Sequence, residues 1–151
     1  MFKEFHQKVP YVINNLQELG VSIDGASKET YEKLRLGGKW EKIIEGLECM
    51  AEQKQKHGFR FILHFVVQKD NYHEMETIID LGEQYGADRV WLNKIEDWGT
   101  SDDFHTQNIW GTTDYKEQFS KVVQRIHSRN NDRFIECPTL ITEAARNRNK
   151  N

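Results

Sequence analysis

Glu18-Leu-Gly-Val-Ser-Ile-Asp-Gly-Ala-Ser-Lys-Glu-Thr-Tyr-Glu-Lys-Leu-Arg35 is the stretch of sequence that decides the fold. The apolar residues of Leu19 to Ile23 predict a short strand, and the Asp24-Gly25 pair that follows is typical of a turn. Ser27 can then cap a helix that runs to Arg35, because its hydroxyl can accept a hydrogen bond from the first-turn amides. The stretch is therefore a strand, a tight turn and a helix. In α/β folds, ligands bind at the carboxyl end of such a strand.

Helical and extended patterns alternate along the rest of the chain. Apolar positions at helical spacing predict helices over Phe2–Leu16, Trp40–His57, Asn71–Tyr85 and Tyr115–Arg129. Apolar runs predict strands at Phe59–Gln68, Arg89–Asn93 and Phe134–Ile135. Pro10 should break or begin the first of these helices. Asn71 and Glu74 have the spacing of a capping box at the start of the third. Ile95–Thr113 shows no clear period and is predicted to be a long loop.

Strands that alternate with helices are typical of right-handed crossovers and a parallel sheet. The predicted class is α/β, with three or four parallel strands and flanking helices. The 151 residues suit one domain, expected over 1–145. They are too few for a complete eightfold α/β barrel, which takes about 250 residues. The polar end of the chain, 146–151, is predicted to be a disordered tail.

Composition excludes several classes of partner. The chain is 37% hydrophobic and 30% charged, and its formal net charge of −3 gives no basic surface for nucleic acid. No apolar run approaches the ~20 residues of a membrane span, and no signal peptide is visible. We therefore expect a cytoplasmic protein that binds neither nucleic acid nor membrane. Its two cysteines, Cys49 and Cys137, form no CxxC pattern, and Cys49 lies on an apolar helix face where a buried side chain is expected.

Three segments resemble, in order, parts of a radical S-adenosylmethionine (SAM) domain. Val21–Trp40 resembles its fourth strand and following helix, especially in the subgroup with SPASM-type C-terminal domains and the sulfatase-maturating enzymes. Phe65–Asn71, with Glu74 and Met75, is similar to the fifth strand and its helix cap. Gly86–Val90 with Lys94–Thr100 is similar to the sixth strand and the loop beyond it. The resemblance covers roughly residues 18 to 126 and implies a partial (β/α) barrel.

That family binds a [4Fe–4S] cluster through the cysteines of a CxxxCxxC motif, and SAM occupies the fourth iron. This chain lacks the motif, because Cys49 and Cys137 lie far apart in sequence. The resemblance therefore implies SAM as a cofactor without a [4Fe–4S] cluster on this chain. We expect no catalytic residues, no metal ligands and no autonomous radical activity.

The resemblance also implies where SAM would bind. Carried over by position, Ser22 would approach the SAM ribose and Arg35 the SAM carboxylate, to which a guanidinium can donate two parallel hydrogen bonds. Asp24 would shape the same turn. Gln68 would end the fifth strand and face the barrel mouth. The end of the sixth strand would lie near the adenine, and the residues there are Leu92 and Asn93.

Each polar candidate also has a purely structural interpretation. Asp24 precedes a glycine and is a standard turn former. Arg35 could pair with Glu29 or Glu32 on a solvated helix face. Asn71 suits a helix cap. His64 lies in a strand with two apolar faces, which is typical of a core histidine or of one at an interface.

Several functional hypotheses remain open from the sequence. The chain is a truncated radical SAM-like domain that keeps part of a SAM-binding crevice, or one subunit of a split radical SAM oxidoreductase. Alternatively it is a non-catalytic scaffold or interaction module, or a gene fragment with no function of its own. An open half-barrel would expose a strand edge, which favours aggregation. We therefore expect this edge to be covered by a second copy in a homodimer, by the N-terminal helix or by an N-terminal partner chain.

Overall fold

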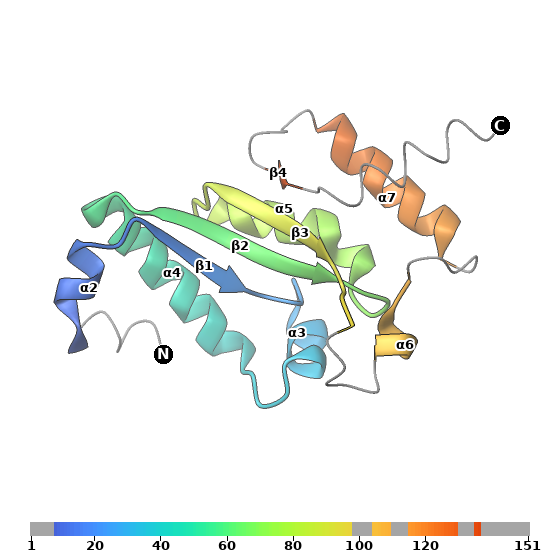
Figure 1. Cartoon of the computed structure of the whole chain (residues 1–151), viewed down its shortest axis with the longest axis horizontal. Coiled ribbons are helices and arrows are strands. Elements are labelled where there is room, and N and C mark those ends of the chain that lie inside the picture. Colours follow the sequence, from blue (N-terminus) through green and yellow to red (C-terminus); the bar gives the residue numbers. More distant parts are fainter. Residues whose placement is uncertain (1–7, 98–103, 110–114, 130–134, 137–151) are drawn as a thin grey trace.

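A parallel sheet of four strands forms the centre of the protein (Figure 1). The computed structural model describes residues 8–97, 104–109, 115–129 and 135–136. The strands are β1 (Glu18–Ser22), β2 (Arg60–Val67), β3 (Arg89–Lys94) and β4 (Ile135–Glu136). They pair in the order β1-β2-β3-β4, all parallel, and β4 contributes only two residues. The described strands form an open sheet, and they confirm the predicted parallel α/β class.

Helices connect the strands. The helices are α2 (Pro10–Asn14), α3 (Lys28–Leu34), α4 (Trp40–His57), the 3₁₀ helix η1 (Tyr72–Glu74), α5 (Met75–Gln84), α6 (Phe104–Gln107) and α7 (Lys116–Ser128). The long helix α4 ends at Gly58, whose φ of 74° is the left-handed conformation that glycine adopts without strain. No described helix has both the length and the apolar character of a membrane span.

The two faces of the sheet differ in character. Strand register places six fully buried side chains on one face: Phe61, Leu63, Phe65, Val67, Val90 and Leu92. They share one core with apolar residues of α4 and α5, including Leu47, Met50, Met75, Ile78 and Ile79. Burying a large apolar side chain contributes about 1.5–3 kcal/mol, so this face supplies most of the free energy that stabilises the sheet. The opposite face carries Ser22, His64 and Trp91, which are exposed or half-buried.

Strand order follows chain order without a reversal. Helices α4 and α5 both pack on the same face, because their apolar residues join one core with the same side of β2 and β3. A doubly wound sheet would instead reverse its strand order at a switch point and place helices on both faces. The described part is therefore wound in one direction. Closure into a partial barrel stays a prediction.

Most predicted elements are confirmed, and the exceptions have physical reasons. Of the predicted helix Phe2–Leu16, the described part contains the helical residue Lys8 and α2, which begins at Pro10 after the non-helical Val9. Proline lacks an N–H and has a fixed φ, so it is tolerated at the first helical position. The predicted loop Ile95–Thr113 contains the short helix α6. Residues 1–7 and the predicted tail 146–151 lie outside the described residues.

Candidate functional site

The carboxyl end of β1 brings three of the predicted site residues together. Ser22 is the last residue of β1 and is exposed. The backbone N–H of Ile23 donates to the His64 carbonyl at 2.9 Å, which holds the next residue, Asp24, beside the end of β2. Arg35, the C-terminal cap of α3, then contacts Asp24. Ser22, Asp24 and Arg35 therefore share one edge of the sheet, although they are up to 13 positions apart in sequence.

Asp24 and Arg35 form an ion pair that links β1 to α3. Arg35 Nη2 lies 2.7 Å from Asp24 Oδ2, and the Asp24 side chain is only 12% exposed. The other carboxylate oxygen accepts a hydrogen bond from the Val66 N–H at 3.1 Å. Asp24 is therefore more than a turn former, since it fixes both the end of β2 and the guanidinium. The alternative pairing of Arg35 with Glu29 or Glu32 is not found among the described residues, where Asp24 is its partner and Glu32 accepts from the Trp40 N–H.

Arg35 keeps donors for a ligand. Within the described residues its Nη1 makes no hydrogen bond, and its buried Nε has no partner. Its side chain remains 40% exposed. A guanidinium held by one carboxylate can still bind a second carboxylate or a phosphate through its free nitrogens. The donor set therefore fits an anionic ligand group at this edge.

Glu74 anchors the loop between β1 and α3. One carboxylate oxygen accepts from the Ala26 N–H at 2.7 Å, and the other accepts from the Ser27 hydroxyl at 2.6 Å and the Thr30 hydroxyl at 2.8 Å. Ser27 in turn caps α3 as predicted, accepting from the Thr30 N–H. The predicted capping box is wrong, because Glu74 reaches across to another loop rather than back to the backbone of Asn71.

Asn71 makes a second connection between the segment after β2 and the segment after β1. Its side chain is fully buried, donates to the carbonyls of Asp24 and Val66, and accepts from the Gln68 N–H. The predicted cap of a helix N-terminus is therefore wrong for this side chain as well. The amide suits the position because it offers two donors and an acceptor, and all of them find partners. Asn71 and Glu74 together fix the backbone that carries Asp24.

A row of side chains crosses the open face beside Ser22. Ser22 is in register with His64, and His64 with Trp91. The imidazole and indole rings are 5.1 Å apart. Gly20 makes room for the imidazole, since a Cβ there would lie 2.8 Å from His64 Nε2. His64 is half-buried on this face rather than enclosed in the core, and the Trp91 Nε1 has no partner within the described residues.

The other predicted site residues lie in different surroundings. Leu92 is fully buried in the core on the helix-bearing face, so only its backbone is near the open side. Asn93 is half-buried on the open face, opposite Val66. Gln68 is half-buried and donates its N–H to Asn71. The structure thus groups Ser22, Asp24 and Arg35, and it places the Leu92 side chain away from them.

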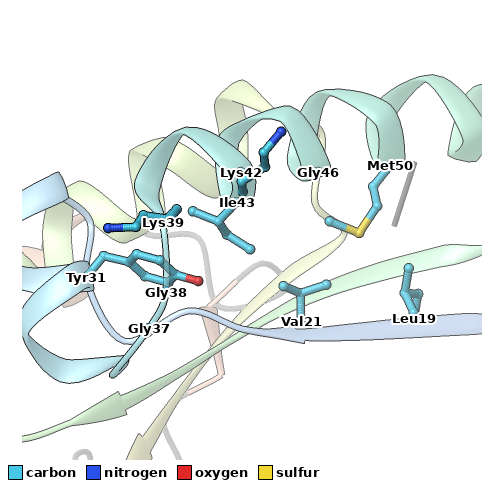
Figure 2. A pocket seen from close by; sticks show the side chains of 10 residues that line it. All are labelled: Leu19, Val21, Tyr31, Gly37, Gly38, Lys39, Lys42, Ile43, Gly46 and Met50. Carbon is cyan, nitrogen blue, oxygen red and sulfur yellow. The ribbon is translucent and has the colours of Figure 1, made fainter. Parts of the chain in front are cut away.

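A cavity of about 550 Å³ lies on the other side of β1, against α4 (Figure 2). Its lining comprises Leu19, Val21, Tyr31, Gly37, Gly38, Lys39, Lys42, Ile43, Gly46 and Met50. Leu19 and Val21 face the cavity from β1, whereas Ser22 faces the opposite side of the sheet. The sequence analysis missed this cavity. The signal was Gly46, a glycine among the apolar positions of a helix, where a Cβ would meet nothing within 4 Å.

No three His, Cys, Asp or Glu side chains of the described residues are grouped so that they could hold a metal ion. Cys49 is buried on α4, as its pattern predicts. Cys137 lies outside the described residues. The site that the structure presents is therefore built from a hydroxyl, a carboxylate and a guanidinium.

Comparison with known proteins points to one relative. No family model matches the chain. Over 73 residues, which are 48% of this chain, it is 34% identical to an AdoMet-dependent heme synthase from Methanosarcina barkeri. The match covers 20% of that protein, so the chain spans about one fifth of the curated relative it matches. The chain is therefore similar to part of a protein whose name states a dependence on AdoMet, which is SAM.

Proposed function

We propose that this chain is part of a radical SAM-like domain that retains a portion of the SAM-binding crevice and does not catalyse a reaction by itself. Two independent lines support the proposal. The heme synthase that it matches is AdoMet-dependent. The carboxyl end of β1 also carries the Ser22 hydroxyl, and the incompletely satisfied Arg35 guanidinium is held to Asp24 two residues further on. The parallel, one-directional sheet is the architecture that a partial barrel requires.

The ion pair between Asp24 and Arg35 is the observation that carries the proposal. It draws the guanidinium from the end of α3 back to the end of β1, where ligands of parallel α/β folds bind. Arg35 would donate to the SAM carboxylate through Nη1, because Nη2 is held by Asp24 and Nε is buried. Ser22 would meet the ribose hydroxyls, and Asp24 would hold Arg35 in position.

The adenine would lie at the end of β3. Asn93 can offer its side-chain amide there, whereas Leu92 can offer only backbone groups, because its side chain is buried. Gln68, at the end of β2, would face the same opening. SAM would supply the adenosyl and methionine groups, and the residues of this chain would bind and orient them.

Absence of autonomous catalysis is inferred from the sequence. A [4Fe–4S] cluster of the family type needs three cysteines with CxxxCxxC spacing, and this chain has two cysteines 88 positions apart (137 − 49). A split enzyme, in which another chain carries the cluster, is the alternative that keeps a catalytic role. The open sheet, with β1 unpaired on its outer side among the described strands, is compatible with such a partner.

Titration calorimetry with SAM tests the proposal. We expect the wild-type chain to bind SAM and Arg35→Ala to bind roughly 10- to 100-fold more weakly, because a hydrogen bond to a charged group is lost. Arg60→Ala is the matched control, since Arg60 is an exposed arginine that pairs with Glu18 at the other end of the sheet. Absence of binding by the wild-type chain, or equal affinities of the two variants, would contradict the proposal.

Anaerobic iron–sulfur reconstitution distinguishes a fragment that only binds SAM from a chain that carries its own cluster. SAM binding without incorporated iron is the expected result. Incorporation of a [4Fe–4S] cluster by this chain alone would contradict the absence of autonomous catalysis.

A further inference from the structure

Two carboxylates accompany the single guanidinium of the candidate site. Asp24 Oδ2 lies 2.7 Å from Arg35 Nη2, so the charge of Arg35 is balanced before any ligand arrives. Glu74 holds the same loop and is also buried. Its partners are one backbone N–H and two hydroxyl groups, none of which carries a charge. The carboxylate of Glu74 is therefore hydrogen-bonded but not neutralised.

Lysines of the neighbouring segments are directed elsewhere. Lys33 pairs with Asp70 at 2.9 Å. Lys69 Nζ lies 5.8 Å from the centroid of the tyrosine ring that precedes α7. Lys94 alternates with Asn93 in β3, so it lies on the helix-bearing face rather than on the open face. None of these three described ammonium groups offsets the second carboxylate at the site.

A carboxylate beside a guanidinium favours ligands that carry both signs of charge. A phosphate dianion that approaches Arg35 also approaches Asp24, and the repulsion opposes the hydrogen bonds that it gains. An α-amino acid group brings an ammonium together with its carboxylate, so each member of the ion pair faces an opposite charge. The Asp24 side chain is only 12% exposed, and charges interact more strongly away from water.

We infer that Asp24 and Glu74 make the crevice selective for a ligand with a zwitterionic α-amino acid end and against phosphorylated nucleosides. The inference rests on the proposed SAM site and adds what determines its specificity. SAM carries such an end on its adenosine, whereas adenosine 5′-monophosphate (AMP) carries a phosphate dianion there. Asp24 thus holds Arg35 and also rejects the anions that a lone guanidinium binds well.

Titration calorimetry with S-adenosylhomocysteine (SAH) and AMP measures the selectivity. Both molecules contain adenosine, and SAH has the amino acid end of SAM without the positive sulfur. The wild type should bind SAH at least about tenfold more tightly than AMP. Binding of SAM with equal affinities for SAH and AMP would overturn this inference alone. Binding of neither SAM nor SAH would overturn the proposed SAM site, and the inference with it.

Asp24→Asn removes the charge beside Arg35 and keeps an oxygen that can accept from the Val66 N–H. We expect AMP to gain affinity relative to SAH, so that the ratio of their dissociation constants changes at least about tenfold in favour of AMP. A purely structural role of Asp24 would weaken both ligands in equal proportion. An unchanged ratio would therefore overturn the inference.

Asp88 provides a matched control, because it has the same kind of partners at the amino end of β3. One of its carboxylate oxygens accepts from the Phe61 N–H at 2.7 Å, and the other lies 2.8 Å from the Lys54 ammonium. Asp88→Asn should leave the ratio of SAH to AMP affinity unchanged. A change as large as that of Asp24→Asn would show that the selectivity does not arise at the candidate site.

Glu74→Gln removes the second charge without touching the ion pair. Circular dichroism first establishes that the variant is folded. The ratio should change in favour of AMP by roughly 2- to 10-fold, less than in Asp24→Asn, because Glu74 forms no ion pair with Arg35. An unchanged ratio would overturn the role of Glu74. This variant and the wild-type ratio test the inference whether or not Asp24→Asn folds.

Discussion

Buried polar residues hold the candidate site in place. Glu74 accepts hydrogen bonds from two groups of the β1–α3 loop and one of the first turn of α3, and Asn71 binds the backbone of Asp24, Val66 and Gln68. Asp24 in turn fixes Arg35. The position of a single guanidinium therefore depends on residues almost 40 positions away in sequence. Substitutions at Glu74 or Asn71 should affect both stability and ligand binding.

Glu74→Gln should lower the free energy of unfolding by roughly 1–3 kcal/mol. If the new amide keeps its oxygen on the Ala26 N–H, its nitrogen faces the Ser27 and Thr30 hydroxyls, which must turn from donors into acceptors, and the carboxylate charge is lost. Urea denaturation measures the change. Glu83→Gln is the control, since its pair with Arg129 is exposed and should contribute less than about 1 kcal/mol. Equal effects of the two substitutions would show that the loop does not depend on Glu74.

Replacing Gly25 and Gly46 by alanine should change the stability of the chain in opposite directions. At Gly25 a Cβ would lie 2.3 Å from the Tyr31 backbone nitrogen, so the β1–α3 turn must shift. We expect Gly25→Ala to destabilise the chain by about 1–3 kcal/mol. Gly46→Ala meets no neighbour and should stabilise α4 by up to about 1 kcal/mol. Thermal unfolding of both variants checks this, and destabilisation by both would contradict the packing described for α4.

At the scale of elements, the sequence correctly predicted the features that depend on residues close together in the chain. The apolar period of Trp40–His57, the glycine after it and the Ser27 cap depend on neighbouring residues, and all are confirmed. Glu74 lies three residues after Asn71 as in a capping box, but its partners come from another loop. The partner of Arg35 and the cavity could not be predicted for the same reason, since both depend on how β1, α3 and α4 pack.

Asp70 joins three elements and should make stability depend on pH. Its carboxylate lies 2.9 Å from the Lys33 ammonium of α3 and accepts a hydrogen bond from Gln107 of α6. The hydrogen bond from Lys33 lowers the pKa of Asp70 below its ordinary value of 3.8, and Gln107 adds to this effect, against burial, which raises the pKa. A lowered folded pKa gives stability that is present above the unfolded value and is lost as pH falls through the folded value.

Comparing the wild type with Asp70→Asn at several pH values measures this contribution. Near neutral pH the wild type should be more stable, by no more than about 1 kcal/mol because Lys33 is largely exposed. The difference should disappear as pH falls below 3.8 toward the folded pKa. A difference that stays constant over this range would exclude Asp70 ionisation as its cause.

At the scale of the whole molecule, β1 contributes to two distinct parts of the surface. The carboxyl edge, with Ser22, Asp24 and Arg35, is the proposed SAM site. The apolar cavity against α4 lies on the other face of the same strand. Because β1 contributes to both, SAM binding at the carboxyl edge can be tested separately from the cavity only with substitutions that reach one of them, such as Arg35→Ala and Gly46→Leu.

Amide chemical shifts in an NMR titration with SAM test the central claim most directly. We predict saturable shifts at Ser22, Asp24 and Arg35, and their loss in Arg35→Ala. Absence of any shift, or shifts confined to cavity residues such as Ile43 and Gly46, would contradict a SAM site at the carboxyl edge.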